Sequence, residues 1–103
     1  MDVMSSITEV LEDIVSMLSE SGMIAQAKWI DERRNIMIAG NHDLSLSALR
    51  ELKRIIAGMG SLTDIHFQLS SDPTLSVSEY NQKFYNKVLE FDNKLRETLS
   101  EID

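Results

Sequence analysis

SITEVLEDIVSMLSESG, residues 6–22, is the stretch that decides the fold of this 103-residue chain. Ser6 and Glu9 have the Ser-x-x-Glu spacing of a helix N-terminal capping box. Apolar residues then recur at the three- and four-residue spacing of one helix face, at Ile7, Val10, Leu11, Ile14, Val15 and Leu18. Gly22 stands where a helix C-cap is expected. The pattern predicts an amphipathic helix that ends near Ser21.

The opposite face of this helix is acidic. Ser16 lies among its four carboxylates, which are Glu9, Glu12, Asp13 and Glu20. Residues 1–20 contain no basic residue, so we expect this acidic ridge to have almost no counter-charge. An acidic surface repels phosphate backbones and attracts basic partners. The four carboxylates are therefore the predicted partner-binding residues.

A second helix is expected from about residue 23 to 39, with Gly40 as its C-cap. One face of it carries Ala27, Ile30, Arg34, Met37 and Ile38, all apolar except Arg34. The short connection at Gly22 predicts an antiparallel hairpin, because the two apolar stripes are buried most readily against each other. Trp29 flanks the stripe and is interpreted as a core residue, with an exposed interface anchor as the alternative.

A third helix is expected to start after residues 41–43, or one turn later at Ser45, and to continue to Gly58. Its apolar positions are Leu46, Leu49, Leu52 and Ile56. Apolar and polar residues then alternate over 63–69, which predicts a short extended segment. We favour an ordered loop over the helices, since no partner strand is evident. Pro73 closes the following turn.

The last helix begins near Ser76 or Ser78 and runs toward the C-terminus. Its apolar stripe is Val77, Tyr80, Phe84, Val88, Phe91, Leu95, Leu99 and Ile102. This heptad-like stripe is long enough to pack along the whole hairpin, and it also suits pairing with a second copy, so a homodimer is an open alternative. The chain is thus predicted to be one mainly α domain, residues 1–103, with four helices.

Residues suited to catalysis or metal binding are sparse. The chain has no cysteine, and its two histidines, His42 and His66, have no second histidine three or four residues away. His42 and Asp43 are expected near a helix cap. No serine has the Gly-x-Ser-x-Gly context, and no lysine follows the glycine pair Gly58 and Gly60. We therefore expect no enzymatic activity, metal or cofactor.

The net charge of −7 and the acidic N-terminal residues are unlike a signal or transit peptide. No apolar run approaches the ~20 residues that span a membrane, so the expectation is a cytoplasmic acidic protein. A central basic group suggests an alternative, a small dimeric helical regulator that binds nucleic acid: Lys28, Arg33, Arg34, Arg50, Lys53 and Arg54. Asp31, Glu32 and Glu51 lie at pairing distance along the chain, which favours solvated ion pairs instead.

Three short segments carry a family resemblance over about residues 23–67. They are Ala27-Lys28-Trp29-Ile30, residues 38–43 (IAGNHD) and residues 57–65 (AGMGSLTDI). They resemble small bacterial proteins with a tryptophan-containing helix, a short Gly-Asp turn and a Gly-Gly-Met-Gly-Ser-(Phe/Leu)-Asn-Asp-(Leu/Ile) signature. This sequence departs from the signature at Ala57, where the family has glycine, and at Thr63, where it has asparagine.

Such proteins look like the acidic immunity proteins encoded beside polymorphic toxins, including contact-dependent growth-inhibition systems. The resemblance implies a protein that binds and neutralises a cognate toxin by stoichiometric association. Toxic nuclease domains are usually basic, so an acidic partner can associate quickly with them and cover the active cleft. The ridge at Glu9, Glu12, Asp13 and Glu20 is the expected contact face.

Overall fold

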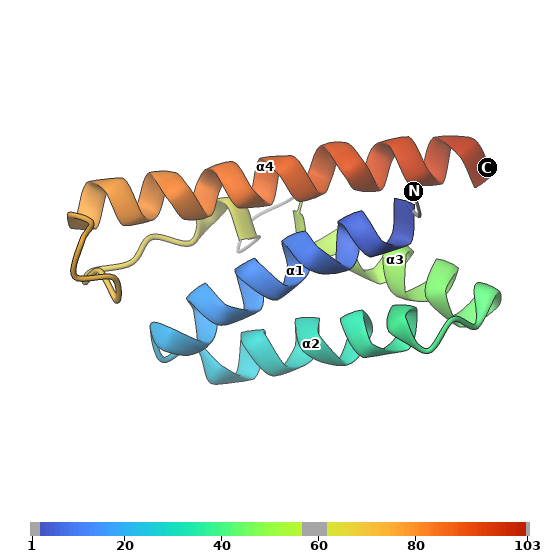
Figure 1. Ribbon diagram of the computed structural model, residues 1–103, viewed down its shortest axis with the longest axis horizontal. Helices are drawn as coiled ribbons and strands as arrows, with labels where there is room; N and C mark the ends of the chain where they lie inside the picture. Colours follow the sequence, from blue (N-terminus) through green and yellow to red (C-terminus); the bar gives the residue numbers. More distant parts are fainter. Residues whose placement is uncertain (1–2, 57–61, 103) are drawn as a thin grey trace.

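Four α-helices and one 3-10 turn form the described chain, residues 3–56 and 62–102 of a computed structural model (Figure 1). In order they are α1 (Val3–Glu20), α2 (Ile24–Ile38), α3 (His42–Ile56), η1 (Leu62–Asp64) and α4 (Val77–Ile102). The predicted mainly α, four-helix architecture with a long C-terminal helix is confirmed. At about 1.5 Å per residue, α4 accounts for the longest dimension of the molecule, 39 Å.

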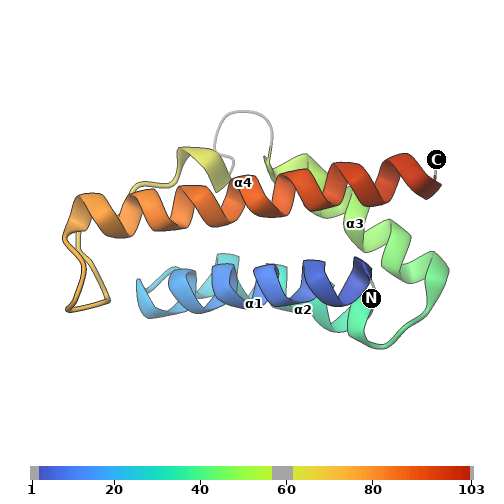
Figure 2. The ribbon, with the colours of Figure 1, turned by 45° about the horizontal axis from the view of Figure 1, so that its top comes forward.

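The helices pack in a ring, in which α1 and α3 each contact both α2 and α4. Figure 1 shows α1 between α4 and α2, with α3 behind it, and both chain ends at the same end of the molecule. Figure 2 shows the connection between η1 and α4 descending beside the α1–α2 turn at the other end. The N-terminal antiparallel hairpin is confirmed.

Gly22 ends α1 in the predicted way. Its φ is +86°, a conformation that costs a residue with a Cβ about 1–2 kcal/mol. The Met23 N–H donates to the Leu18 carbonyl at 2.9 Å and the Gly22 N–H to the Ser19 carbonyl at 3.1 Å, as in a Schellman motif. Gly40, with φ +83°, likewise follows the C-terminus of α2 and ends that helix.

The predicted capping box at Ser6 is wrong. The chain is already helical from Val3, so Ser6 lies inside α1, where its hydroxyl accepts a hydrogen bond from Lys94 Nζ at 2.6 Å. A capping box is found instead at the start of α4. The Glu79 N–H donates to Ser76 Oγ at 3.1 Å, and the Ser76 N–H donates to Glu79 Oε1 at 3.0 Å. This confirms the earlier of the two predicted starts.

The start predicted for α3, after Asp43, is also wrong. The helix begins at His42, because the side chain of Asn41 accepts the Leu44 N–H at 3.0 Å and thereby caps the first turn. His42 and Asp43 lie next to this cap, as expected. The predicted end at Gly58 falls outside the described residues.

The core is built from the predicted stripes. Its fully buried members include Ile7, Leu11, Ile14 and Leu18 of α1, Ile30 of α2, Leu49 and Leu52 of α3, and Phe84, Val88, Phe91 and Leu95 of α4. Two predicted stripe residues are on the surface instead, with exposed fractions of 57% for Ile38 and 36% for Val77. Each lies at the end of a helix, where less neighbouring structure covers it. Leu69, predicted in the alternating segment, lies in the loop before α4 and is 79% exposed.

The segment that precedes α4 packs as an ordered loop, and no strand occurs among residues 3–56 and 62–102. Leu62–Asp64 forms a 3-10 turn rather than extended chain. Phe67 is buried edge-on against the rings of Tyr80 and Phe84, with centroids 5.2 and 5.0 Å away. The favoured interpretation, a loop over the helices, is confirmed, and its extended part is limited to residues after 64.

Candidate partner-binding surface

The four carboxylates of the predicted ridge lie on one side of α1 and are all exposed. Successive helix residues are ~100° apart, which places Glu9, Glu12, Asp13 and Glu20 within about a third of the helix circumference. The buried stripe of α1 faces the other way. The helix therefore presents the ridge on a surface flanked by α2 on one side and α4 on the other.

The prediction that the ridge has almost no counter-charge is wrong for two of its members. Glu12 pairs with Arg34 of α2, Oε2 to Nη2 at 3.2 Å. Asp13 pairs with Lys87 of α4, Oδ2 to Nζ at 3.0 Å, and Glu90 lies 3.8 Å from the same ammonium. The hydrogen bond to Asp13 raises the pKa of Lys87 above its ordinary value. Both cations come from other helices, so the charge count over residues 1–20 could not include them.

The other two members, Glu9 and Glu20, make no ion pair within residues 3–56 and 62–102. Glu20 is the last residue of α1, and the last turn of that helix contains no basic residue. A carboxylate is disfavoured there because the helix dipole is negative at its C-terminus. The local field at this end of α1 therefore favours an added cation.

Arg33 and Arg34, two members of the central basic group on α2, turn toward different neighbouring helices. Arg33 pairs with Glu51 of α3 at 2.8 Å and with Glu32 at 3.2 Å, and its guanidinium lies 4.0 Å from the centre of the Trp29 ring. Arg34 turns toward α1, where it pairs with Asp31 and Glu12. The predicted ion pairs with Asp31, Glu32 and Glu51 are confirmed.

Trp29 is partly buried, so it is neither a fully buried core residue nor a fully exposed one. Its ring packs against the core as a partly buried residue, and its outer side is covered by the guanidinium of Arg33. Cation–π stacking of this kind stabilises the pair by about 0.5–1 kcal/mol at exposed sites. The ring is therefore a boundary residue between the core and the α2–α3 surface.

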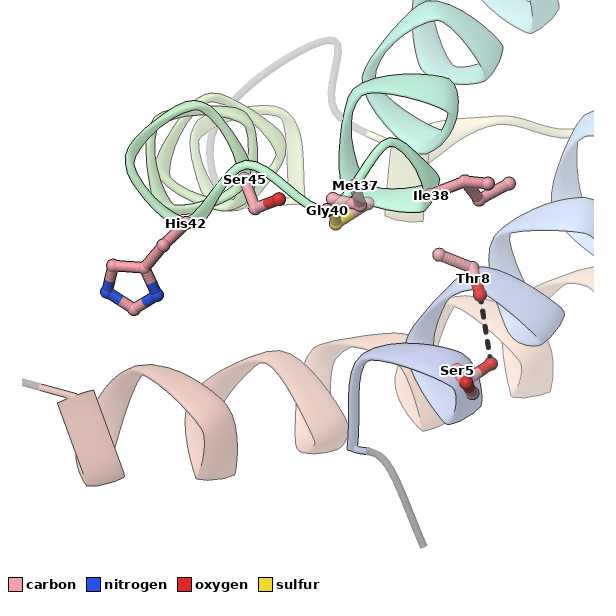
Figure 3. Close-up of a pocket in the computed structure, with 7 residues that line it drawn as sticks. All are labelled: Ser5, Thr8, Met37, Ile38, Gly40, His42 and Ser45. Carbon is pink, nitrogen blue, oxygen red and sulfur yellow. Dashed lines mark hydrogen bonds between the residues drawn. The ribbon is translucent and has the colours of Figure 1, made fainter.

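A hollow of about 370 Å³ lies between the start of α1 and the α2–α3 turn (Figure 3). Its polar lining consists of Ser5, Thr8, His42 and Ser45. In Figure 3 the imidazole of His42 points away from Ser5 and Thr8, and the Thr8 hydroxyl donates to the Ser5 carbonyl at 3.0 Å. These groups do not converge on one point as a nucleophile and its base would.

A second hollow, of about 430 Å³, lies at the opposite end of the molecule, where the α1–α2 turn meets the loop before α4. Glu20 of the ridge and His66 contribute to its wall, together with Met23 and Leu69. Sequence reasoning did not identify this hollow, because its residues come from segments more than 40 positions apart. No local pattern in the sequence indicates it.

No group of three or more histidines and carboxylates within the described ranges is placed to hold a metal ion. Nor does any helix there have the length and apolar character needed to cross a membrane. Comparisons with protein-family models, curated proteins and solved structures found no match for this chain.

Proposed function

We propose that this protein is an immunity-type inhibitor that binds a basic toxin domain one to one in the cytoplasm and so blocks its activity. The resemblance over residues 23–67 suggests this class, and a nuclease domain is the expected partner. The acidic ridge of α1 is the proposed contact face.

One observation carries the proposal: Glu9 and Glu20 stand on a well-supported helix without a cation of their own among the described residues. Beneath them, Ile7, Leu11 and Ile14 are fully buried, which fixes the helix against the core. The backbone that carries these carboxylates is therefore fixed before any partner arrives. A face on a fixed backbone loses less conformational freedom on binding than a disordered segment would, which favours affinity.

The paired members of the ridge support the same role in a different way. Arg34 and Lys87 bind α1 to its two neighbours through Glu12 and Asp13, so the surface around the free carboxylates is fixed as well. The net charge of −7 adds a long-range attraction for a basic domain. Such steering raises association rates and weakens as salt screens it.

A direct test mixes the purified protein with the toxin domain encoded beside it and measures binding by calorimetry at low and high salt. We expect a 1:1 complex whose affinity falls as ionic strength rises. The variants Glu9→Lys and Glu20→Lys should weaken binding, because each reverses a ridge charge. Asp43→Lys, at the start of α3 and outside the ridge, makes the same change in net charge and should have a smaller effect.

The nucleic-acid alternative has less support. Binding to nucleic acid would need the six basic residues on one free surface. Arg33 instead pairs with Glu51 of α3, and Arg34 pairs with Glu12 of α1. A labelled DNA duplex mixed with the protein at low salt distinguishes the two functions. Tight, salt-dependent duplex binding without toxin binding would replace the immunity proposal.

A further inference from the structure

The hollow at the α1–α2 end has a fixed framework. The Ser21 hydroxyl lies 3.2 Å from that of Ser71 and 3.3 Å from that of Tyr80, and the Tyr80 hydroxyl donates to the Met17 carbonyl at 3.2 Å. These bonds join α1, the loop and α4. The walls of the hollow are therefore held in a fixed arrangement by hydrogen bonds among all three segments.

The lining of the hollow combines an apolar surface with one carboxylate, the imidazole of His66 and uncharged polar side chains. Leu69 exposes 79% of its surface and, like the partly buried Met23, belongs to the wall. Glu20 stands in the same wall without an ion pair in the described chain, and the carbonyl end of α1 adds negative potential beside it. A single exposed leucine is ordinary in proteins. Its position beside an uncompensated carboxylate indicates a more specific ligand.

A ligand that complements both features has an aliphatic stem and a cationic head. We propose that this hollow receives an arginine side chain of the basic partner, an inference that rests on the proposed function for the identity of that partner. The methylene groups lie along Leu69 and Met23, and the guanidinium meets the Glu20 carboxylate. Arginine fits because its stem packs on apolar surface while its planar head donates two parallel hydrogen bonds to a carboxylate.

Glu9 provides a matched control within the same helix. It is exposed, lies on the same ridge and has no ion pair among the described residues, but it does not belong to the wall of this hollow. Glu9→Gln and Glu20→Gln therefore change the net charge equally. Only Glu20→Gln removes the group that the proposal places against the guanidinium.

The test uses Nα-acetyl-arginine amide as the probe and the amide spectrum of the 15N-labelled full chain as the readout. We expect saturable shifts confined to the region of Glu20, Met23 and Leu69, with affinity about fivefold weaker in Glu20→Gln and unchanged in Glu9→Gln. Leu69→Ser should also weaken binding. Nα-acetyl-citrulline amide, which has nearly the same shape without the charge, should cause no comparable shifts.

Three results would overturn the inference: no binding of the arginine probe, shifts of equal size with the citrulline probe, or arginine shifts spread evenly along the ridge. The outcome is independent of the toxin experiment. A chain that binds its toxin but not the arginine probe keeps the proposed function and loses this anchor site. A chain that binds the probe at the hollow but no toxin retains the site and loses the proposed function.

Discussion

Asn81 shows how a single side chain positions an irregular segment. Its Oδ1 accepts the Phe67 N–H at 2.6 Å, and its Nδ2 donates to the carbonyls of Phe67 at 2.9 Å and of Val77 at 3.0 Å. The amide thus makes the two backbone contacts that a neighbouring strand would make. Phe67 can then bury its ring against α4 without a strand partner, and the wall of the second hollow is held in place.

Replacing Asn81 by alanine should lower the free energy of unfolding by about 1–3 kcal/mol, because the Phe67 N–H and carbonyl lose their partner while partly buried. Urea denaturation monitored by circular dichroism measures the change. Gln82→Ala is the matched control, since that amide is exposed and, among the described residues, bonds only to Asn86. A loss in Asn81→Ala no greater than in Gln82→Ala would show that this contact does not stabilise the fold.

Burial could be predicted from sequence at the scale of single residues, whereas pairing could not. The helical spacing identified Ile7, Leu11 and Phe84 as core residues because periodicity alone places them on one face. The amide contact of Asn81 with Phe67 and the ion pair of Asp13 with Lys87 join residues 14 and 74 positions apart. No local pattern specifies which distant side chains meet, so these contacts required the tertiary structure.

At the scale of elements, α4 has the best-defined beginning in the chain. Ser76 and Glu79 exchange hydrogen bonds there, and the bonds from the backbone and side chain of Ser76 hold the pKa of Glu79 below its ordinary value. Just before the helix, hydrogen bonds from the side chain and backbone of Thr74 lower the pKa of Asp72 in the same way. The start of α4 is thus stabilised by ionised carboxylates.

A depressed pKa means that the folded state favours the ionised form of Glu79. Its contribution to stability is therefore fully present above the pKa of the unfolded chain, near 4.5. The contribution is lost as the pH falls through the lower pKa of the folded state. Glu79→Gln should therefore be less stable than the native chain at pH 7, and the difference should shrink in acid below pH 4.5. Urea denaturation of both proteins from pH 7 to pH 3 measures it. A difference that does not change with pH would contradict this role for the carboxylate.

The same Ser-x-x-Glu spacing occurs at residues 6–9 and 76–79, but only the second pair caps a helix. A capping box needs a non-helical backbone at its serine. Ser6 does not meet this condition, since α1 begins at Val3, whereas Ser76 directly precedes Val77. Sequence therefore predicted that these helices exist and that Gly22 and Gly40 end α1 and α2, but it misplaced the starts of α1 and α3.

At the scale of the whole molecule, ridge carboxylates of α1 form ion pairs with a cation on each side, Arg34 from α2 and Lys87 from α4. The long C-terminal helix buries its stripe against the rest of the chain, with Phe91 and Leu95 fully covered. The fold class followed from periodicity. The ion pairing of the ridge did not, because it depends on which helices lie beside α1.

Removing the cation of Lys87 should strengthen the attraction of the ridge for a basic partner. In Lys87→Gln, Asp13 loses its counter-charge, so association with the toxin domain should be faster at low salt. The free energy of unfolding should fall by up to about 1 kcal/mol, the contribution of an ion pair near the surface. Stopped-flow mixing measures the rate. Arg96→Gln is the control, because it makes the same charge change at a cation paired within α4 to Asp92. Equal acceleration in both variants would mean that net charge matters and the ridge does not.

The proposed function is inhibition of a toxin by stoichiometric binding. Titrating the toxin domain with this protein tests it most directly. Nuclease activity of the neighbouring toxin domain is measured on a labelled nucleic acid while increasing amounts of the protein are added. The account predicts a linear fall in activity that ends at one equivalent of the native protein. Undiminished nuclease activity in the presence of a several-fold excess of folded protein would contradict it.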